Sequence, residues 1–270
     1  MLGEFLNSRL FRRSAPELPP IEAESPIYVI GDVHGRDDVL VPLVDQIMQD
    51  AASQPSTGAP PQLVFVGDMV DRGPGTRGVI EFLMAVQDWP ELETHFLVGN
   101  HELMMLQFIN DPVMGRRWLR YGGYETVQSY DIGRVGDLSD EHELRRVAEA
   151  FQLALGPHLA FVEDLKPWHL NGNLLITHAG ADPGLSPAQQ TIDALVWGVP
   201  SFYQRARTDG LWVVHGHTIV EQPLVRDGRI SVDTGAYQSG TLTALKVYGT
   251  EVSFLSETGP AVPEFDDYLD

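Results

Sequence analysis

The chain has 270 residues, with 18 Lys and Arg against 38 Asp and Glu, and therefore a formal net charge of −20 at pH 7. A chain this acidic repels a phosphate backbone, which excludes nucleic-acid binding through a basic surface, and an anionic substrate would need local positive charge inside its site. The absence of cysteine excludes disulfides, thiolate metal ligands and cysteine nucleophiles, and it fits a reducing compartment.

Residues 1–25 are predicted to form an N-terminal arm outside the globular domain. Apolar and basic side chains mix over residues 1–13, and Pro16, Pro19 and Pro20 stiffen the lead-in to the first strand. The sequence contains no apolar stretch of about 18 residues, the length of a membrane span. We therefore expect a soluble, cytoplasmic protein without stable membrane association, whereas the oligomeric state is left open.

Three strand–helix units are predicted next, because each β-branched or leucine-rich run is followed by apolar residues at helical spacing. The strands are expected at residues 27–30, 63–66 and 96–98, and the helices over 39–48, 80–86 and 102–109. Residues 111–170 carry aromatic and charged helical segments without a convincing strand, which predicts a helical insert. Strands are expected again at 174–177, 211–214, 230–232, 242–248 and 252–255, with Gly249-Thr250 closing a hairpin. The globular domain is thus expected over residues 26–256 and an acidic tail over 257–270.

Five of these predicted strands stop at short polar segments that hold carboxylates, imidazoles or an amide. The segments are GDVHG (31–35), GDMVDRG (67–73), GNHE (99–102), HAG (178–180) and GHT (216–218). Strands that deliver such side chains to one rim of a sheet can hold two adjacent divalent cations, which need a shared carboxylate and further ligands on either side. Any one segment is also compatible with an ordinary polar turn, but five together indicate a two-metal hydrolase.

The spacing of the polar residues suggests how two ions would be shared. Asp32 and His34 are two residues apart, so on an extended strand both would point the same way and hold the first ion. Asp68, at the neighbouring strand end, is expected to bridge to the second. The remaining ligands are expected to be Asn100, His178 and His217. Mixed nitrogen and oxygen ligation without sulfur favours two Mn ions, with Fe or Zn as alternatives, and a hydroxide held between them would be the nucleophile.

Three further residues are expected beside the ions rather than bound to them. His101 follows a proposed ligand and so points into the cleft, where a leaving oxygen needs a proton. Asp71 is expected to orient this imidazole and raise its pKa through its opposite charge. Arg72 is the expected fork for two phosphoryl oxygens.

With these residues the chain resembles the phosphoprotein phosphatase (PPP-type) family of metallophosphoesterases, and most of all its compact bacterial and phage members, such as the phage lambda phosphatase. The family signatures GDxHG, GDxVDRG and GNHE are intact, and THAG (177–180), GHT (216–218) and DTGA (233–236) agree as well. The resemblance covers residues 26–256. It implies a four-layer α/β/β/α sandwich with the site at the carboxyl edges of the central strands, the ligand set given above, and the same roles for His101, Asp71 and Arg72.

One departure from the family concerns phosphate binding. Members usually carry a second phosphate-binding arginine in a W-x-R stretch after the THAG segment, and Val199 stands at that place here. Arg36 and Arg205 are the candidates to replace it. Asn100 is also expected to contact the phosphate.

The residues and the resemblance together predict a phosphatase that hydrolyses phosphomonoesters, with phosphoserine or phosphothreonine in proteins as the expected substrates. Phosphotyrosine and small phosphoesters are further expected substrates. One alternative is a hydrolase of dinucleoside polyphosphates such as diadenosine tetraphosphate, since related bacterial enzymes share the same ligands. A second alternative is a metal-binding pseudophosphatase that serves as a scaffold, against which the intact His101, Asp71 and Arg72 argue.

Overall fold

The computed structural model describes residues 18–55 and 58–262, so residues 1–17 of the predicted arm and 263–270 of the predicted tail lie outside the described residues. Within the described ranges the strands form two five-stranded sheets. The first has the order β10-β9-β1-β2-β3. Its strands are β1 (Ile27–Ile30), β2 (Gln62–Phe65), β3 (Glu93–Phe96), β9 (Thr241–Tyr248) and β10 (Glu251–Thr258). β1, β2 and β3 are parallel, whereas β9 is antiparallel to β1.

The second sheet has the order β4-β5-β6-β8-β7. Its strands are β4 (His169–Asn171), β5 (Leu174–Ile176), β6 (Trp212–His215), β7 (Leu224–Arg226) and β8 (Arg229–Ser231). β5, β6 and β8 are parallel, so this sheet also gathers several carboxyl ends at one edge. The short η2 (Pro187–Gln189) follows β5, and α10 (Ala236–Ser239) precedes β9.

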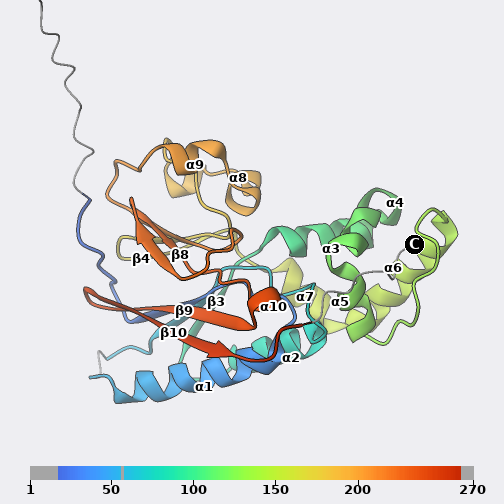
Figure 1. Cartoon of the computed structure of the whole chain (residues 1–270), viewed down its shortest axis with the longest axis horizontal. Coiled ribbons are helices and arrows are strands. Elements are labelled where there is room, and N and C mark those ends of the chain that lie inside the picture. The colour runs from blue at the N-terminus through green and yellow to red at the C-terminus, as the bar shows by residue number, and fades with distance from the viewer. Residues whose placement is uncertain (1–17, 56–57, 263–270) are drawn as a thin grey trace, which may run out of the picture.

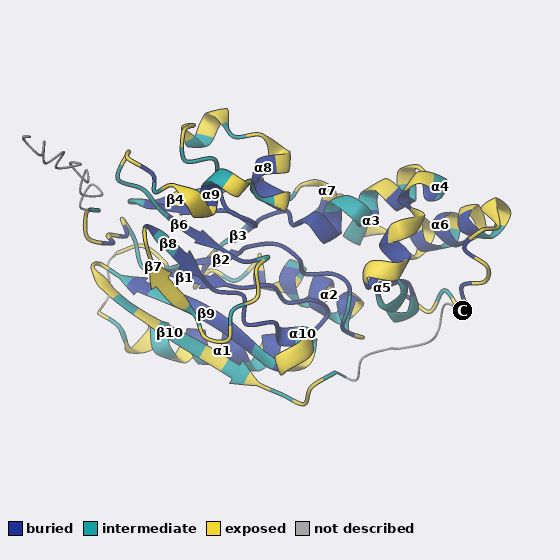
Figure 2. Cartoon of the chain, turned by 45° about the horizontal axis from the view of Figure 1, so that its top comes forward, coloured by how far each residue is buried: buried dark blue, intermediate teal, exposed yellow. Residues whose placement is uncertain are grey.

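Helices cover the outer face of each sheet, and apolar side chains fill every interface between layers. α1 (Asp37–Ser53) and α2 (Thr76–Val86) pack on the first sheet, and α8 (Ile192–Trp197) and α9 (Pro200–Gln204) pack on the second. A third apolar cluster lies between the two sheets. Figure 1 shows the layers, and Figure 2 shows that the strands are mostly buried while the outward helix faces are exposed. The predicted four-layer α/β/β/α sandwich is confirmed.

α3 (Asn100–Asn110) is the helix of the third predicted strand–helix unit. The remaining helices lie within residues 111–170, the predicted insert, which extends from one end of the sandwich (Figure 1). They are α4 (Pro112–Gly115), η1 (Arg116–Tyr121), α5 (Gly123–Ser129), α6 (Glu141–Leu155) and α7 (Pro157–Glu163). The insert has its own core, in which Trp118 packs between Phe108 and Phe151. Among the described residues, no helix combines the length and apolarity needed to cross a membrane.

The boundaries and two edge strands differ from the sequence prediction. β4 begins at His169, inside the stretch expected to be helical, and β10 continues through Thr258, two residues beyond the expected end of the domain. β7 was not predicted, because its sequence Leu-Val-Arg holds one apolar pair and no longer apolar run, and the structure leaves all three residues exposed. Both missed strands are three residues long, which is too short for a periodicity to be read.

Candidate active site

The polar segments predicted from the sequence meet at one edge of the two sheets. Asp32, Asp68, His178 and His217 follow β1, β2, β5 and β6, and Asn100 begins α3. The carboxyl ends of parallel strands lie at the same edge of a sheet, and the facing sheets bring their two edges together here. The resulting pocket has a volume of about 540 Å³ and is lined by residues of all these segments except the HAG segment.

The backbone of this edge is strained. Seven non-glycine residues among those described have a positive φ, and five of them belong to the predicted site. They are His34 (φ 47°), Asp68 (50°), Asp71 (75°), Arg72 (69°) and His217 (64°). A left-handed conformation costs roughly 1–3 kcal/mol for a residue with a Cβ atom, and such strain persists where the surroundings enforce it, most often at functional sites.

The prediction that Asp32 and His34 lie on an extended strand was wrong. β1 ends at Ile30, and His34 is left-handed, so the two residues do not alternate along an extended strand. Their side chains nevertheless line the same pocket, because the turn after the strand redirects the imidazole.

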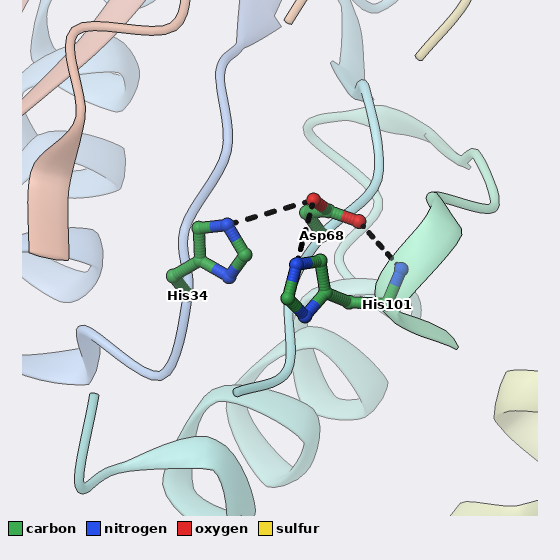
Figure 3. A group of neighbouring side chains, drawn as sticks. All are labelled: His34, Asp68 and His101. Atoms are coloured by element: carbon green, nitrogen blue, oxygen red, sulfur yellow. Dashed lines mark hydrogen bonds and ion pairs between the residues drawn. The ribbon is translucent and has the colours of Figure 1, made fainter. Parts of the chain in front are cut away.

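The carboxylate of Asp68 lies at the centre of the site. Its Oδ2 atom is 3.5 Å from Nε2 of His34, 3.9 Å from Nε2 of His101 and 3.4 Å from Nε2 of His178. Figure 3 shows His34 and His101 approaching it from two different segments. Its Oδ1 atom accepts a hydrogen bond from the backbone N–H of His101, at 3.0 Å. One buried carboxylate thus faces three imidazoles.

Two groups of possible metal ligands share this aspartate. His34, Asp68 and His101 form one group. Asp68, His178 and His217 form the other, and the amide oxygen of Asn100 lies 2.9 Å from His178 Nε2 and 3.0 Å from His217 Nδ1. The arrangement has the shared carboxylate that two neighbouring cations require.

The buried carboxylates of this site show whether its residues suit divalent cations. Asp32 Oδ1 is buried without a hydrogen-bond partner, while its Oδ2 accepts from the backbone N–H of His217 at 3.0 Å. Burial, with the nearby charges of Asp233 and Asp68, raises the pKa of Asp32 well above its usual value. Burial also raises the pKa of Asp233 to about 6. The three buried carboxylates of Asp32, Asp68 and Asp233 repel each other unless positive charge compensates them. This set of donors therefore fits two divalent ions.

Backbone carbonyls orient two of the candidate histidine ligands. His34 Nδ1 is 2.8 Å from the carbonyl oxygen of Val70, and His178 Nδ1 is 3.1 Å from that of Val66. An Nδ1–H that donates to a carbonyl leaves the lone pair of Nε2 facing Asp68, as a metal ligand must. Burial lowers the pKa of His34 to about 3, which keeps the ring neutral.

His101 and Asp71 form a buried pair beside this centre. His101 Nδ1 lies 2.6 Å from Asp71 Oδ2. The same oxygen accepts from Trp118 Nε1 at 2.7 Å, and Asp71 Oδ1 accepts from the Thr126 hydroxyl at 2.8 Å. Burial alone lowers the pKa of His101, but Asp68 and Asp71 outweigh it and raise the pKa to about 9. His101 therefore lies at the pocket with a raised pKa, and two residues of the insert that the sequence analysis did not assign, Trp118 and Thr126, hold its partner Asp71.

Glu102 is a further residue whose role the sequence analysis missed, although it ends the GNHE segment. Its Oε1 accepts from the backbone N–H groups of Met69 and Val70, at 2.7 and 3.2 Å. Its Oε2 accepts from those of Asp68 and Gly99, at 2.9 and 2.8 Å. One buried side chain thus joins the turn that carries Asp68 to the start of α3, and it fixes the position of Asp68 relative to Asn100 and His101.

We expect Glu102→Gln to destabilise the fold, because the amide nitrogen would replace an oxygen that accepts two backbone N–H groups and would leave both without an acceptor. A buried donor without a partner costs about 1–3 kcal/mol. Urea unfolding should show this loss, while the exposed Glu163→Gln on α7 should be neutral. An unchanged unfolding midpoint in Glu102→Gln would show that the carboxylate is not needed to hold the turn.

The predicted phosphate-binding arginines are not all at the pocket. Arg72 lines it, with its guanidinium 5.2 Å from the ring centre of Tyr237 and its buried Nε without a hydrogen-bond partner among the described residues. Arg36 instead pairs with Asp38 and donates to the carbonyls of Ala236 and Pro260. Its guanidinium therefore ties the start of α1 to the segments around Ala236 and Pro260, and it does not line the pocket.

Arg205 is exposed and does not line the pocket either. Val199, at the place of the absent family arginine, is half-buried and packs against the apolar cluster beneath α8 and α9. A second arginine does line the pocket, but it is Arg117 of the insert, which the sequence analysis did not consider.

The sequence model of the calcineurin-like phosphoesterase family matches residues 25–221. Curated relatives align over nearly their full length. The chain is 28% identical over 257 residues to the bis(5′-nucleosyl)-tetraphosphatase PrpE (asymmetrical) of Halalkalibacterium halodurans, covering 87% of this chain and 96% of that protein. It is 28% identical over 256 residues to the protein of the same name from Geobacillus thermodenitrificans, covering 88% and 97%.

Solved structures show the same fold. A candidate diadenosine tetraphosphatase superposes with a TM-score of 0.57 at 18% identity, covering 88% of this chain and 96% of that one. A cold-active protein-tyrosine phosphatase from a Shewanella species superposes with a TM-score of 0.51 at 18% identity, covering 86% and 80%. The predicted enzyme class, a metal-dependent phosphoesterase, is confirmed by the family match.

The predicted substrate is contradicted. The sequence analysis favoured phosphoserine and phosphothreonine in proteins, whereas the curated relatives that align end to end are named tetraphosphatases. The findings favour the alternative of a dinucleoside polyphosphate hydrolase. The metal-site motifs did not distinguish the two activities, because hydrolysis of an ester and of an anhydride both begin with attack on phosphorus and can use the same metal ligands.

Proposed function

Because the chain belongs to the calcineurin-like phosphoesterase family, we propose that it hydrolyses dinucleoside polyphosphates of the diadenosine tetraphosphate type. The observation that carries the proposal is the end-to-end similarity to relatives named for this activity, combined with a pocket in which two ligand groups share Asp68. The relatives' name specifies asymmetrical cleavage, which for a tetraphosphate corresponds to a nucleoside monophosphate and a nucleoside triphosphate as products.

We propose that two ions share Asp68, and that Asp32, whose Oδ1 is buried without a hydrogen-bond partner, replaces His101 in the first ligand group, because His101 pairs with Asp71. Asp32, His34 and Asp68 would hold one ion, and Asp68, Asn100, His178 and His217 the other. Manganese suits these nitrogen and oxygen donors, with iron or zinc as alternatives. When bound, the ions would offset the negative charge of the phosphates and lower the pKa of a coordinated water.

The other residues at the pocket would bind the substrate and move its proton. The unpaired Nε of Arg72 points to a ligand, and its guanidinium would hold two oxygens of the phosphate that is attacked. In the reaction, the oxygen of one water adds to phosphorus and the P–O bond to the next phosphate breaks. His101, kept protonated by Asp68 and Asp71, would give its proton to the departing oxygen.

A side-by-side assay of the metal-loaded enzyme tests the substrate class. Diadenosine tetraphosphate, a phosphoserine peptide and p-nitrophenyl phosphate would be compared by kcat/KM. We expect the dinucleotide to exceed the phosphopeptide by at least 100-fold, and chromatography to show AMP and ATP in equal amounts. A higher kcat/KM for the phosphopeptide would refute the proposal, and two molecules of ADP would refute the asymmetry.

A further inference from the structure

A second cavity adjoins the pocket of the proposed site, and arginines line its walls. It has a volume of about 1080 Å³ and lies between the segment from α4 through η1 and the loop that precedes α6. Arg116, Arg117, Arg120 and Arg134 line it, and we call it the arginine cavity. Met114, Arg117 and Tyr121 line both this cavity and the pocket that contains Asp68. The two spaces are therefore neighbours that share a wall.

The residues that line this cavity carry a net positive charge, whereas the whole chain is strongly negative. The protein carries −20 overall, yet four of its 18 cationic side chains line this one space. Within the described ranges none of these four guanidinium groups takes part in an ion pair or hydrogen bond, whereas other arginines of the insert and sandwich do. One carboxylate also lines the cavity, that of Asp137, and it accepts hydrogen bonds from the backbone and hydroxyl of Ser139.

Unpaired arginines that converge on one space repel each other unless an anion joins them, and guanidinium groups match phosphate oxygens in geometry. The cavity is large enough for a nucleotide. Tyr121 is 47% exposed at the shared wall and offers an aromatic face to a nucleobase. A phosphomonoester held at Arg72 would end inside the pocket, whereas a dinucleoside polyphosphate would continue past Arg117 into the arginine cavity.

We propose that the arginine cavity binds the nucleoside triphosphate part of a dinucleoside polyphosphate, the part that leaves when the bond at the Asp68 centre breaks. This inference rests on the proposed function. It explains how so acidic a protein would attract a polyanion. A locally positive cavity beside the site would raise the local concentration of the substrate despite the negative net charge of the protein. It also supplies a source of preference for long phosphate chains that the metal ligands themselves lack.

The double variant Arg120→Ala/Arg134→Ala tests the proposal and leaves Arg117, which borders the pocket, in place. We expect the KM for diadenosine tetraphosphate to rise at least tenfold, and the loss in kcat/KM to be at least tenfold greater for this substrate than for p-nitrophenyl phosphate. The matched control is Arg145→Ala/Arg146→Ala, which removes two arginines of α6 that pair with Glu141 and Glu143. The control should stay within twofold of the wild type on both substrates.

Product inhibition separates this proposal from the proposed function. With metal in excess over nucleotide, ATP should inhibit p-nitrophenyl phosphate hydrolysis, and its inhibition constant should rise at least fivefold in Arg120→Ala/Arg134→Ala while that of inorganic phosphate stays within twofold. Should the wild type fail to cleave the dinucleotide, the proposed function is wrong, and this ATP measurement still decides the role of the cavity. An unchanged inhibition constant for ATP, or equal losses on both substrates, would overturn it.

Discussion

Replacing Asp68 by asparagine should abolish hydrolysis and leave the protein unable to load two metal ions. The carboxylate oxygen that lies within 3.9 Å of three imidazoles is the one donor shared by both ligand groups. An amide carries no charge and presents one oxygen and one N–H group, so it cannot compensate two neighbouring cations. We expect kcat to fall by a factor on the order of 10³, the upper end of the loss seen when a preorganised electrostatic contact to the reacting group is removed.

Elemental analysis of the Asp68→Asn protein should show clearly fewer than two equivalents of metal per chain, measured alongside kcat on diadenosine tetraphosphate. Asp164→Asn is the matched control, because that carboxylate is 81% exposed and pairs only with Lys166 at the surface. Thermal unfolding of both variants would show whether a loss of activity reflects a loss of fold. Normal activity together with two bound equivalents in Asp68→Asn would remove Asp68 from the bridging position.

The part of the fold that the sequence predicts well is the part with a strong apolar signal. β1 was expected at 27–30 and spans those residues, because all four are buried between helices and the second sheet and so read as a continuous apolar run. β7 has the opposite character, with every residue exposed, and no local pattern could reveal it. The polar segments at strand ends were found for a related reason: each follows a strand that the apolar pattern identifies.

What the sequence could not supply are contacts between segments far apart in the chain. Arg36 appeared free to replace the absent arginine, yet its guanidinium donates to the carbonyls of Ala236 and Pro260, 200 and 224 residues away. The sequence did not predict Trp118 and Thr126 as hydrogen-bond partners of Asp71, because only the packing of the insert places them next to it. The arginine cavity likewise arises from two segments that fold together, and no spacing within either one indicates a phosphate site.

His101→Asn is expected to slow hydrolysis in proportion to the basicity of the leaving group. The imidazole lies 2.6 Å from Asp71 and lines the pocket beside Asp68. General acid catalysis contributes about 10²–10⁴-fold, and it matters most when an alkoxide leaves. We expect the full loss on glycerol phosphate and a loss at least tenfold smaller on diadenosine tetraphosphate and p-nitrophenyl phosphate, whose leaving groups are weak bases.

Two further variants separate proton donation from a general disturbance of the pocket. His158→Asn removes an imidazole of the same insert that lies 2.8 Å from the hydroxyl of Tyr130, and it should leave all three substrates within twofold of the wild type. Trp118→Phe keeps an aromatic side chain, although a smaller one, and deletes the N–H that donates to Asp71, so it should reproduce the order of losses seen in His101→Asn at a smaller size. Equal losses on all three substrates in His101→Asn would mean that the imidazole holds the site together rather than supplying a proton, because only a proton donor distinguishes strong from weak leaving bases.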